Sequence, residues 1–201
     1  MARNRRDEVA REAAKLIYEG VVTEYIAAKR KACELLGVKV MPSNREVALA
    51  LDELLETRDG ERRREYTVKK RRVALSVMRY LSSFSPRLVG SVWRGLCREG
   101  SDIDIVVFSE DPDLVVKRLC RVGVRVLGVE VRGNPFKEPE RKYVRITASY
   151  MNEIIDIKVK PPAERENQEV CEIFGDVVTG LSLVELESLL KRDPLKKFLP
   201  R

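Results

Sequence analysis

Apolar side chains recur every three or four residues through the first third of the chain. Val9, Ala13 and Leu16 begin one stripe, and a comparable stripe follows over residues 47–55. This spacing keeps the apolar side chains on one face of a helix. The sequence therefore predicts an N-terminal helical segment, to which we assign residues 1–70.

The spacing of the apolar residues changes near Pro86. Before that point Ala74 and Val77 continue the helical pattern, whereas beyond it polar and apolar residues alternate in short runs, as in half-buried strands. The runs cover residues 87–89, 102–108, 122–132, 143–149 and 154–159. Strands interspersed with short helices predict an α/β (α+β) core, which we place at residues 71–162, followed by a C-terminal helical tail at residues 163–201.

Composition describes a globular protein with a charge-dense surface. Hydrophobic residues make up 44% of the 201 residues and charged residues 35%, proportions that disfavour disordered and membrane classes. No apolar run is long enough to span a bilayer, and the Arg-rich start lacks the apolar centre of a secretory signal. We therefore expect a cytoplasmic protein without membrane contact. A single glutamine beside abundant Arg and Glu is typical of a thermophile.

The cysteines give no sign of a metal or redox site. Cys33, Cys97, Cys120 and Cys171 are far apart and form no C-x-x-C pair. Buried, inert thiols are the favoured interpretation. In a heat-adapted organism an intracellular disulfide stays open as an alternative.

The chain contains no histidine. This absence excludes Ser-His-Asp and Cys-His catalysis, His-ligated zinc and an imidazole general base. Acid-base or metal chemistry must therefore use carboxylates, lysines or thiols.

Three carboxylates and a Gly-Ser pair form the constellation that carries chemistry. Gly90-Ser91 precedes Asp102-Ile103-Asp104 by ten residues, and Asp156 lies in a later strand. Side chains alternate between the faces of a strand, so Asp102 and Asp104 point to one side while Ile103 packs on the other. If the two strands are neighbours in a sheet, the three carboxylates converge on one patch.

Such a cluster would repel itself unless a hard divalent cation neutralised it. Carboxylate oxygens suit Mg²⁺ or Mn²⁺, and two ions can activate an attacking hydroxyl and stabilise the leaving oxygen of an in-line phosphoryl displacement. Gly90 allows close backbone approach, and amides at the start of the following helix can hold triphosphate oxygens.

The stretch LVGSVWRGLCREGSDIDIVV resembles the signature of the polymerase-beta-like nucleotidyltransferases, and the resemblance covers residues 72–160. It implies a mixed β-sheet flanked by helices. By this resemblance Asp102 and Asp104 would bind two metal ions, and Asp156 would complete the site and help to activate the acceptor hydroxyl. Gly90 and Ser91 would bind the nucleotide phosphates.

The sequence also departs from larger members of that family. Residues 163–201 are too few for the helical domain that follows the catalytic core in poly(A) polymerases and tRNA-CCA-adding enzymes. The N-terminal helical segment matches no characterised substrate-binding module. The acceptor therefore stays open.

Two further residues are candidates for nucleotide binding. Arg94 could contact phosphate, with an exposed structural arginine as the alternative, and Lys158 shares the strand face of Asp156 and could neutralise a phosphate. Asp156 itself has a plainer alternative, namely a solvated carboxylate paired with Lys158.

A basic run, ERRREYTVKKRR at residues 61–72, carries a net charge of +5 out of the chain's +7. It is interpreted either as a solvated helix end or as a contact for nucleic-acid phosphates, which salt would weaken. The candidate contact residues are Arg62, Arg63, Arg64, Lys69, Lys70, Arg71 and Arg72.

The favoured hypothesis is a nucleotidyltransferase of the EC 2.7.7 type. It would move a nucleoside monophosphate from a nucleoside triphosphate such as ATP to a hydroxyl acceptor and release pyrophosphate, with Mg²⁺ or Mn²⁺ as cofactor. The basic run favours RNA as acceptor over a protein or a small molecule. The alternatives are a non-catalytic or regulatory module that binds nucleic acid or protein, including a toxin-neutralising partner, and a DNA-binding helical protein that uses residues 1–85.

Overall fold

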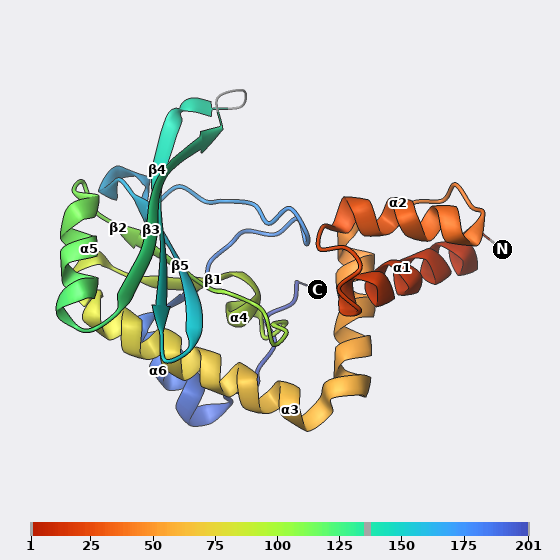
Figure 1. Cartoon of the computed structure of the whole chain (residues 1–201), viewed down its shortest axis with the longest axis horizontal. Coiled ribbons are helices and arrows are strands. Elements are labelled where there is room, and N and C mark those ends of the chain that lie inside the picture. Colours follow the sequence, from red (N-terminus) through yellow and green to blue (C-terminus); the bar gives the residue numbers. More distant parts are fainter. Residues whose placement is uncertain (1, 135–137, 201) are drawn as a thin grey trace. The chain divides into compact units, whose positions relative to one another are not determined.

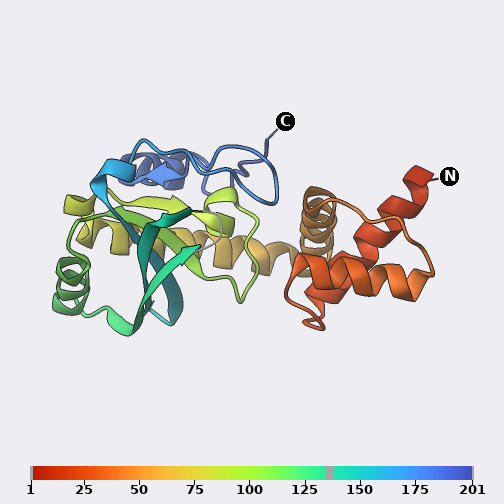
Figure 2. The ribbon, with the colours of Figure 1, turned by 90° about the horizontal axis from the view of Figure 1, so that it is seen from above.

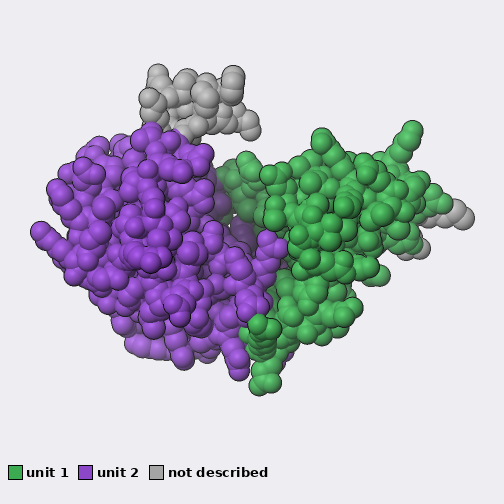
Figure 3. All heavy atoms as spheres, viewed as in Figure 1, with its two compact units in different colours: residues 1–63, 170–177, 200–201 green, residues 64–169, 178–199 purple. Residues whose placement is uncertain are grey.

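The computed structural model describes residues 2–134 and 138–200. Its contacts divide the chain into two compact units, each with its own apolar core (Figure 3). Unit 1 comprises Met1–Arg63, Val170–Val177 and Pro200–Arg201, and unit 2 comprises Arg64–Glu169 and Val178–Leu199. None of the described helices is both long and apolar enough to cross a membrane.

Unit 1 is helical, as the spacing of its apolar residues predicts. It contains α1 (Ala2–Tyr18), α2 (Tyr25–Leu36) and the first part of α3 (Asn44–Tyr80). The expected stripes form its core, with Val9, Ala13, Val47 and Leu51 buried together. Helix α3 is interrupted at Gly60, whose backbone is non-helical.

Unit 2 contains the rest of α3 and a six-stranded sheet (Figure 1). The strands are β1 (Arg87–Val89), β2 (Ile103–Phe108), β3 (Arg125–Asn134), β4 (Glu138–Tyr150), β5 (Glu153–Lys160) and β6 (Leu181–Ser182). Their order is β3-β4-β5-β2-β1-β6; β2 and β5 are parallel and the other described pairs antiparallel. The helices are α4 (Gly90–Arg94), α5 (Pro112–Arg121) and α6 (Leu183–Arg192), with 3₁₀ turns at Ser82–Phe84 and Pro162–Glu164. The expected α+β fold with a mixed sheet and an N-terminal helical segment is confirmed.

The core of unit 2 lies on one face of the sheet. Ile103 and Ile105 of β2 pair in register with Ile155 and Ile157 of β5, and all four side chains are fully buried. Apolar residues of α3 and α5 belong to the same core, and Figure 2 shows the two helices beside the sheet. Each such side chain contributes about 1.5–3 kcal/mol by leaving water. Because β2 and β5 are fixed in this way, the residues between the isoleucines must face the opposite side.

Two expectations need correction. The sequence predicts a C-terminal helical tail at residues 163–201, but the α-helix within it, α6, occupies only Leu183–Arg192. The stretch before α6 contains Gly175 and Gly180, both in the left-handed backbone region, which interrupts helical geometry. None of the four cysteines forms a disulfide, and of the expected buried thiols only Cys97 is buried, whereas Cys33 and Cys171 are half-buried. Cys120 is exposed because the buried face of α5 is taken by Val115 and Leu119.

Candidate active site

Gly90 and Asp104 meet where β1 ends and α4 begins. Val89 pairs with Asp104 across β1 and β2, and Gly90 follows with φ +69°, in the left-handed region that favours glycine. An ideal Cβ at Gly90 would lie 2.0 Å from Oδ2 of Asp104 and 2.7 Å from its Cγ. The carboxylate of Asp104 is thus packed directly against the backbone of the Gly-Ser turn. A side chain at position 90 would displace it.

The aspartates of the two central strands lie side by side. Asp104 of β2 is in register with Asp156 of β5, and both are half-buried on the face opposite the isoleucine core. Asp102 directly precedes β2 and is exposed. The condition set by the sequence, that the two strands be neighbours, is therefore met.

The negative charges of these carboxylates affect the pKa of Asp104. Burial raises the pKa of Asp104 from 3.8 to about 7, with further raising effects from the negative charges of Asp156 and Asp102. The positive charge of Arg145 lowers the same pKa but does not offset the others. Without a cation, Asp104 therefore keeps its proton to a higher pH than an ordinary aspartate does. Because a bound cation would offset this repulsion between negative charges, Asp104 is a favourable cation ligand.

Asp156 has a partner that the sequence analysis missed. Arg145, on the adjacent strand β4, donates from Nε to Oδ1 of Asp156 at 2.8 Å, and its Nη2 lies 2.6 Å from Oδ2. The two-point geometry is that of a strong Arg–carboxylate pair, and the hydrogen bond to Asp156 raises the pKa of Arg145. The alternative that paired Asp156 with Lys158 is not what the structure shows. The alternation of residues 143–149 does place Arg145 on an outward face, but only the β4–β5 register brings it to Asp156.

The carboxylates of this site are candidate ligands for a divalent cation. Among the residues with described placement, no three acidic or cysteine side chains are grouped as metal ligands. Asp102 and Asp104 nevertheless offer oxygen donors two positions apart, and Asp104 is held between the turn at Gly90 and the charge of Asp156. Oxygen-only donors of this kind fit Mg²⁺ or Mn²⁺, with Asp156 engaged by Arg145.

The other predicted nucleotide-binding residues take different positions. Ser91 is half-buried in the first turn of α4, next to Gly90. Lys158 lies on the open sheet face, where its Nζ is 2.9 Å from Glu169 Oε1 and 4.3 Å from the centroid of the Tyr143 ring. Arg94 is buried: its guanidinium lies 4.5 Å from the Trp93 ring and donates to the carbonyl of Phe198. Ser91 therefore directly follows the glycine that packs against Asp104, whereas Arg94 is buried at the end of α4 and is neither a phosphate contact nor an exposed arginine.

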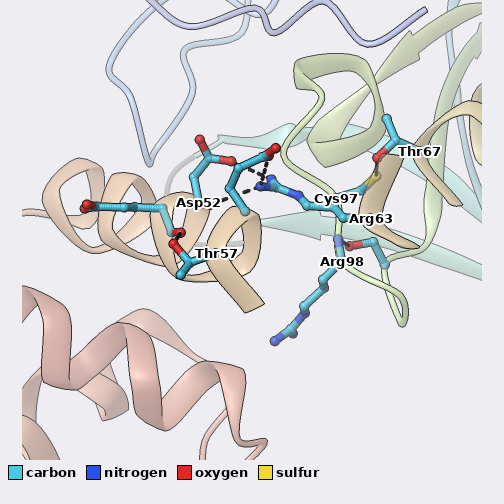
Figure 4. Close-up of polar contacts among 9 residues, drawn as sticks. Asp52, Thr57, Arg63, Thr67, Cys97 and Arg98 are labelled. Atoms are coloured by element: carbon cyan, nitrogen blue, oxygen red, sulfur yellow. Dashed lines mark hydrogen bonds and ion pairs between the residues drawn. The ribbon is translucent and has the colours of Figure 1, made fainter. Parts of the chain in front are cut away.

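The basic run is divided between surface and interior. In unit 1, Arg63 is buried and binds both the carboxylate and the backbone carbonyl of Asp52, as Figure 4 shows. In unit 2, Lys70 is buried against Glu153 and the carbonyl of Ser101. These two cations act inside the fold.

Arg71 is the most deeply placed member of the run, with 0% of its surface exposed. It donates to four backbone carbonyls, two at the end of α4 and two after α6; the acceptors are Val92, Trp93, Pro194 and Lys196. Burial lowers its pKa. Arg71 therefore fastens the segment after α6 to the core.

The remaining basic residues of the run, Arg62, Arg64, Lys69 and Arg72, are exposed. A helical signal separates the two groups, because the apolar stripe through Ala74 and Val77 extends backward through Lys70, Thr67 and Arg63 at steps of three and four. The stripe is hard to recognise in the sequence because its positions in the basic run are polar or charged residues.

Comparison with known proteins agrees with this arrangement. The model of the nucleotidyltransferase domain matches residues 72–174, which includes the Gly-Ser turn, the paired aspartates of β2 and β5, and Arg145. No curated protein matches the chain. The match covers half of the chain and coincides with the carboxylate site of unit 2, so the chain belongs to the nucleotidyltransferase domain family.

Proposed function

We propose that the protein is a metal-dependent nucleotidyltransferase that transfers a nucleoside monophosphate from a nucleoside triphosphate to a hydroxyl acceptor. The observation that carries the proposal is the packing of Asp104 against Gly90, in register with Asp156. This contact supports the proposal because a carboxylate with a raised pKa packs against a backbone turn of a kind that suits phosphate oxygens.

Each residue has a defined part in the proposal. Asp102 and Asp104 would hold Mg²⁺ or Mn²⁺, which neutralises phosphate charge and polarises the α-phosphate when bound. The backbone at Gly90 and the hydroxyl of Ser91 would hold the outgoing phosphates. Asp156, oriented by Arg145, would accept the proton of the acceptor hydroxyl.

The overall reaction balances without a further reactant. The acceptor oxygen forms a bond to the α-phosphorus, the bond from that phosphorus to the bridging oxygen breaks, and pyrophosphate leaves. The proton of the acceptor passes to Asp156 and then to water. Lys158 lies on the same face as Asp156. It would leave its ion pair with Glu169 and bind a phosphate of the acceptor or the nucleotide instead.

RNA is the proposed acceptor. The support is the exposed part of the basic run within unit 2, Arg64, Lys69 and Arg72, whose charge suits a phosphate backbone. Lys70 and Arg71 of the same unit are buried and do not contribute to this surface.

One observation favours a second candidate, a non-catalytic or regulatory member of the family, such as a toxin-neutralising partner. Asp156 is already paired with Arg145, and no described group of three acidic side chains is arranged as a metal centre. Such a module would retain the fold and bind nucleic acid or protein without transfer.

Labelling distinguishes the two candidates. The protein is incubated with Mg²⁺, each α-³²P-labelled nucleoside triphosphate and total cellular RNA and protein. We expect label in RNA that is lost with Asp104→Asn and kept with Asp113→Asn, a control on the exposed first turn of α5. Absence of label in every fraction, together with no heat of triphosphate binding in calorimetry, would favour the non-catalytic module.

A further inference from the structure

The two edges of the sheet differ sharply. At one edge β6 has 2 residues, whereas at the other β3 has 10. Strand β3 pairs with β4, and the sheet order places no further described strand on its outer side. A long unpaired edge offers a row of backbone donors and acceptors to another strand.

Strand β3 has two of the features that usually protect such an edge, charged side chains and register irregularities, but lacks two others. Between Arg125 and Asn134 it contains no Lys and no Pro. Two of its valines face water: Val129 is 50% exposed and Val131 70%. The strand therefore combines an open backbone edge with exposed β-branched residues.

The regular part of β3 is short. Pairing with β4 shifts register between Val126 and Gly128, and again between Gly133 and Asn134. The segment from Gly128 to Gly133 lies between these irregularities, and Val131 is one of its two central residues.

The charges around Val131 are self-complementary. Glu130 and Arg132 flank it on the opposite face of the strand, both exposed, and within one chain they form an ion pair. In an antiparallel pair of two β3 strands centred on Val131, Glu130 lies opposite the partner subunit's Arg132, and Arg132 lies opposite the partner subunit's Glu130. Opposite charges in facing positions stabilise a strand pair, and like charges destabilise it. A pair centred on Val129 would instead face Glu130 with the partner subunit's Gly128 and lose this match.

We propose that two copies of the chain associate through β3, antiparallel and centred on Val131, so that their sheets join into one. The contact is isologous and closes as a two-fold dimer rather than continuing as a fibre. It buries one short strand on each side, which lies at the low end of interface sizes, so the dimer is reversible and depends on concentration.

Sedimentation equilibrium of the full chain over a concentration series tests the proposal. Wild type should shift from monomer to dimer as concentration rises, and Val131→Glu should be monomeric over the same range. The matched control is Val184→Glu, because Val184 is 72% exposed but lies on α6. Far-ultraviolet circular dichroism establishes that each variant is folded. A wild type that stays monomeric up to its solubility limit, or a Val131→Glu variant that dimerises like wild type, overturns the proposal.

Charge exchange tests the register. Glu130→Arg places like charges opposite each other twice in the symmetric pair, as does Arg132→Glu, and each should weaken dimerisation by about tenfold. The double variant restores both pairs and should recover the wild-type dissociation constant. Failure of the double variant to recover, with all variants folded, contradicts pairing centred on Val131.

Discussion

Asp104 occupies the space that a β-carbon on Gly90 would need, with Oδ2 only 2.0 Å from that position. The glycine and the carboxylate therefore depend on each other: the left-handed turn can form close to β2 only without a side chain, and the turn in return fixes the orientation of the carboxylate.

Gly90→Ala should abolish cation-dependent nucleotide binding and lower the free energy of unfolding by about 2–4 kcal/mol, because it adds backbone strain and a steric clash with Asp104. Isothermal titration with Mg²⁺ and nucleoside triphosphate, together with urea unfolding, measures both effects. Gly123→Ala is the control, since Gly123 has φ +80° and an added Cβ would meet nothing within 4 Å. It should show the strain alone and bind nucleotide normally. Equal nucleotide binding by the two variants would contradict the assignment of Gly90 to the site.

The raised pKa of Asp104 makes stability depend on pH. The folded-state pKa of about 7 exceeds the ordinary value of 3.8, so the folded protein binds a proton more tightly than the unfolded chain between these limits. The stabilisation is fully present below pH 4 and is lost as pH rises through 7, by up to about 4 kcal/mol. Asp104→Asn should remove this part of the pH dependence in urea titrations without divalent cations. An unchanged stability profile in that variant would contradict the raised pKa.

Cation affinity should follow the opposite trend. Because protons and cations compete for the carboxylate of Asp104, Mg²⁺ should bind more tightly as pH rises from 6 to 8. Added Mg²⁺ should therefore offset the loss of stability at the upper end of this range.

The positive charge of Arg145 beside Asp156 and Asp104 should oppose cation binding at the carboxylate site. Arg145→Met removes the two-point ion pair and one positive charge near Asp104, so it should tighten Mn²⁺ binding by about fivefold, roughly 1 kcal/mol. Arg192→Met, at the exposed end of α6, is the charge-matched control and should leave the affinity unchanged. Titration calorimetry with Mn²⁺ measures the difference. Weaker Mn²⁺ binding in Arg145→Met would show that Arg145 orients Asp156 for the ion instead.

The sequence predicts the carboxylate strands because their alternation is local. Ile103 and Ile105 enclose Asp104 within one strand, and Ile155 and Ile157 enclose Asp156, so burial of the isoleucines fixes where the aspartates point. The β2–β5 pairing joins residues 52 positions apart, and the motif alone states it only as a condition. Arg145 was missed for the same reason, since its partner is specified by the register of β4 on β5 rather than by any local pattern.

The basic run at residues 61–72 shows that net charge in the sequence does not predict which residues are exposed. Its net charge of +5 indicates a surface, but charge does not reveal which side of a helix a residue takes. Arg71 and Arg72 are adjacent in the sequence, yet one is fully buried and the other exposed. The buried carbonyls that Arg71 satisfies lie more than twenty or more than a hundred residues away, so no local pattern announces them.

Arg71 and Arg72 therefore supply the most discriminating pair of substitutions. Arg71→Met leaves four backbone carbonyls without their donor and should lower the free energy of unfolding by about 3 kcal/mol or more. Arg72→Met should change stability by less than about 0.5 kcal/mol, because the side chain is exposed. Urea unfolding of the two variants checks both values.

For RNA binding we expect the opposite ranking of the two substitutions: in folded protein, Arg72→Met should have the larger effect and Arg71→Met the smaller. If Arg72 contacts a phosphate, Arg72→Met should weaken binding to single-stranded RNA. The plot of log affinity against log salt should then become less steep by about 0.7. Under conditions in which Arg71→Met is still folded, this variant should show the same slope of log affinity against log salt as wild type. The reason is that Arg71 is bound to backbone carbonyls and cannot reach a phosphate. Fluorescence anisotropy with a labelled RNA at several salt concentrations measures the slopes. An identical slope in Arg72→Met and wild type would leave Arg64 and Lys69 as the remaining exposed cations of the run in unit 2. If a double neutral variant of these two residues also had no effect, the exposed basic residues of unit 2 would not contact RNA.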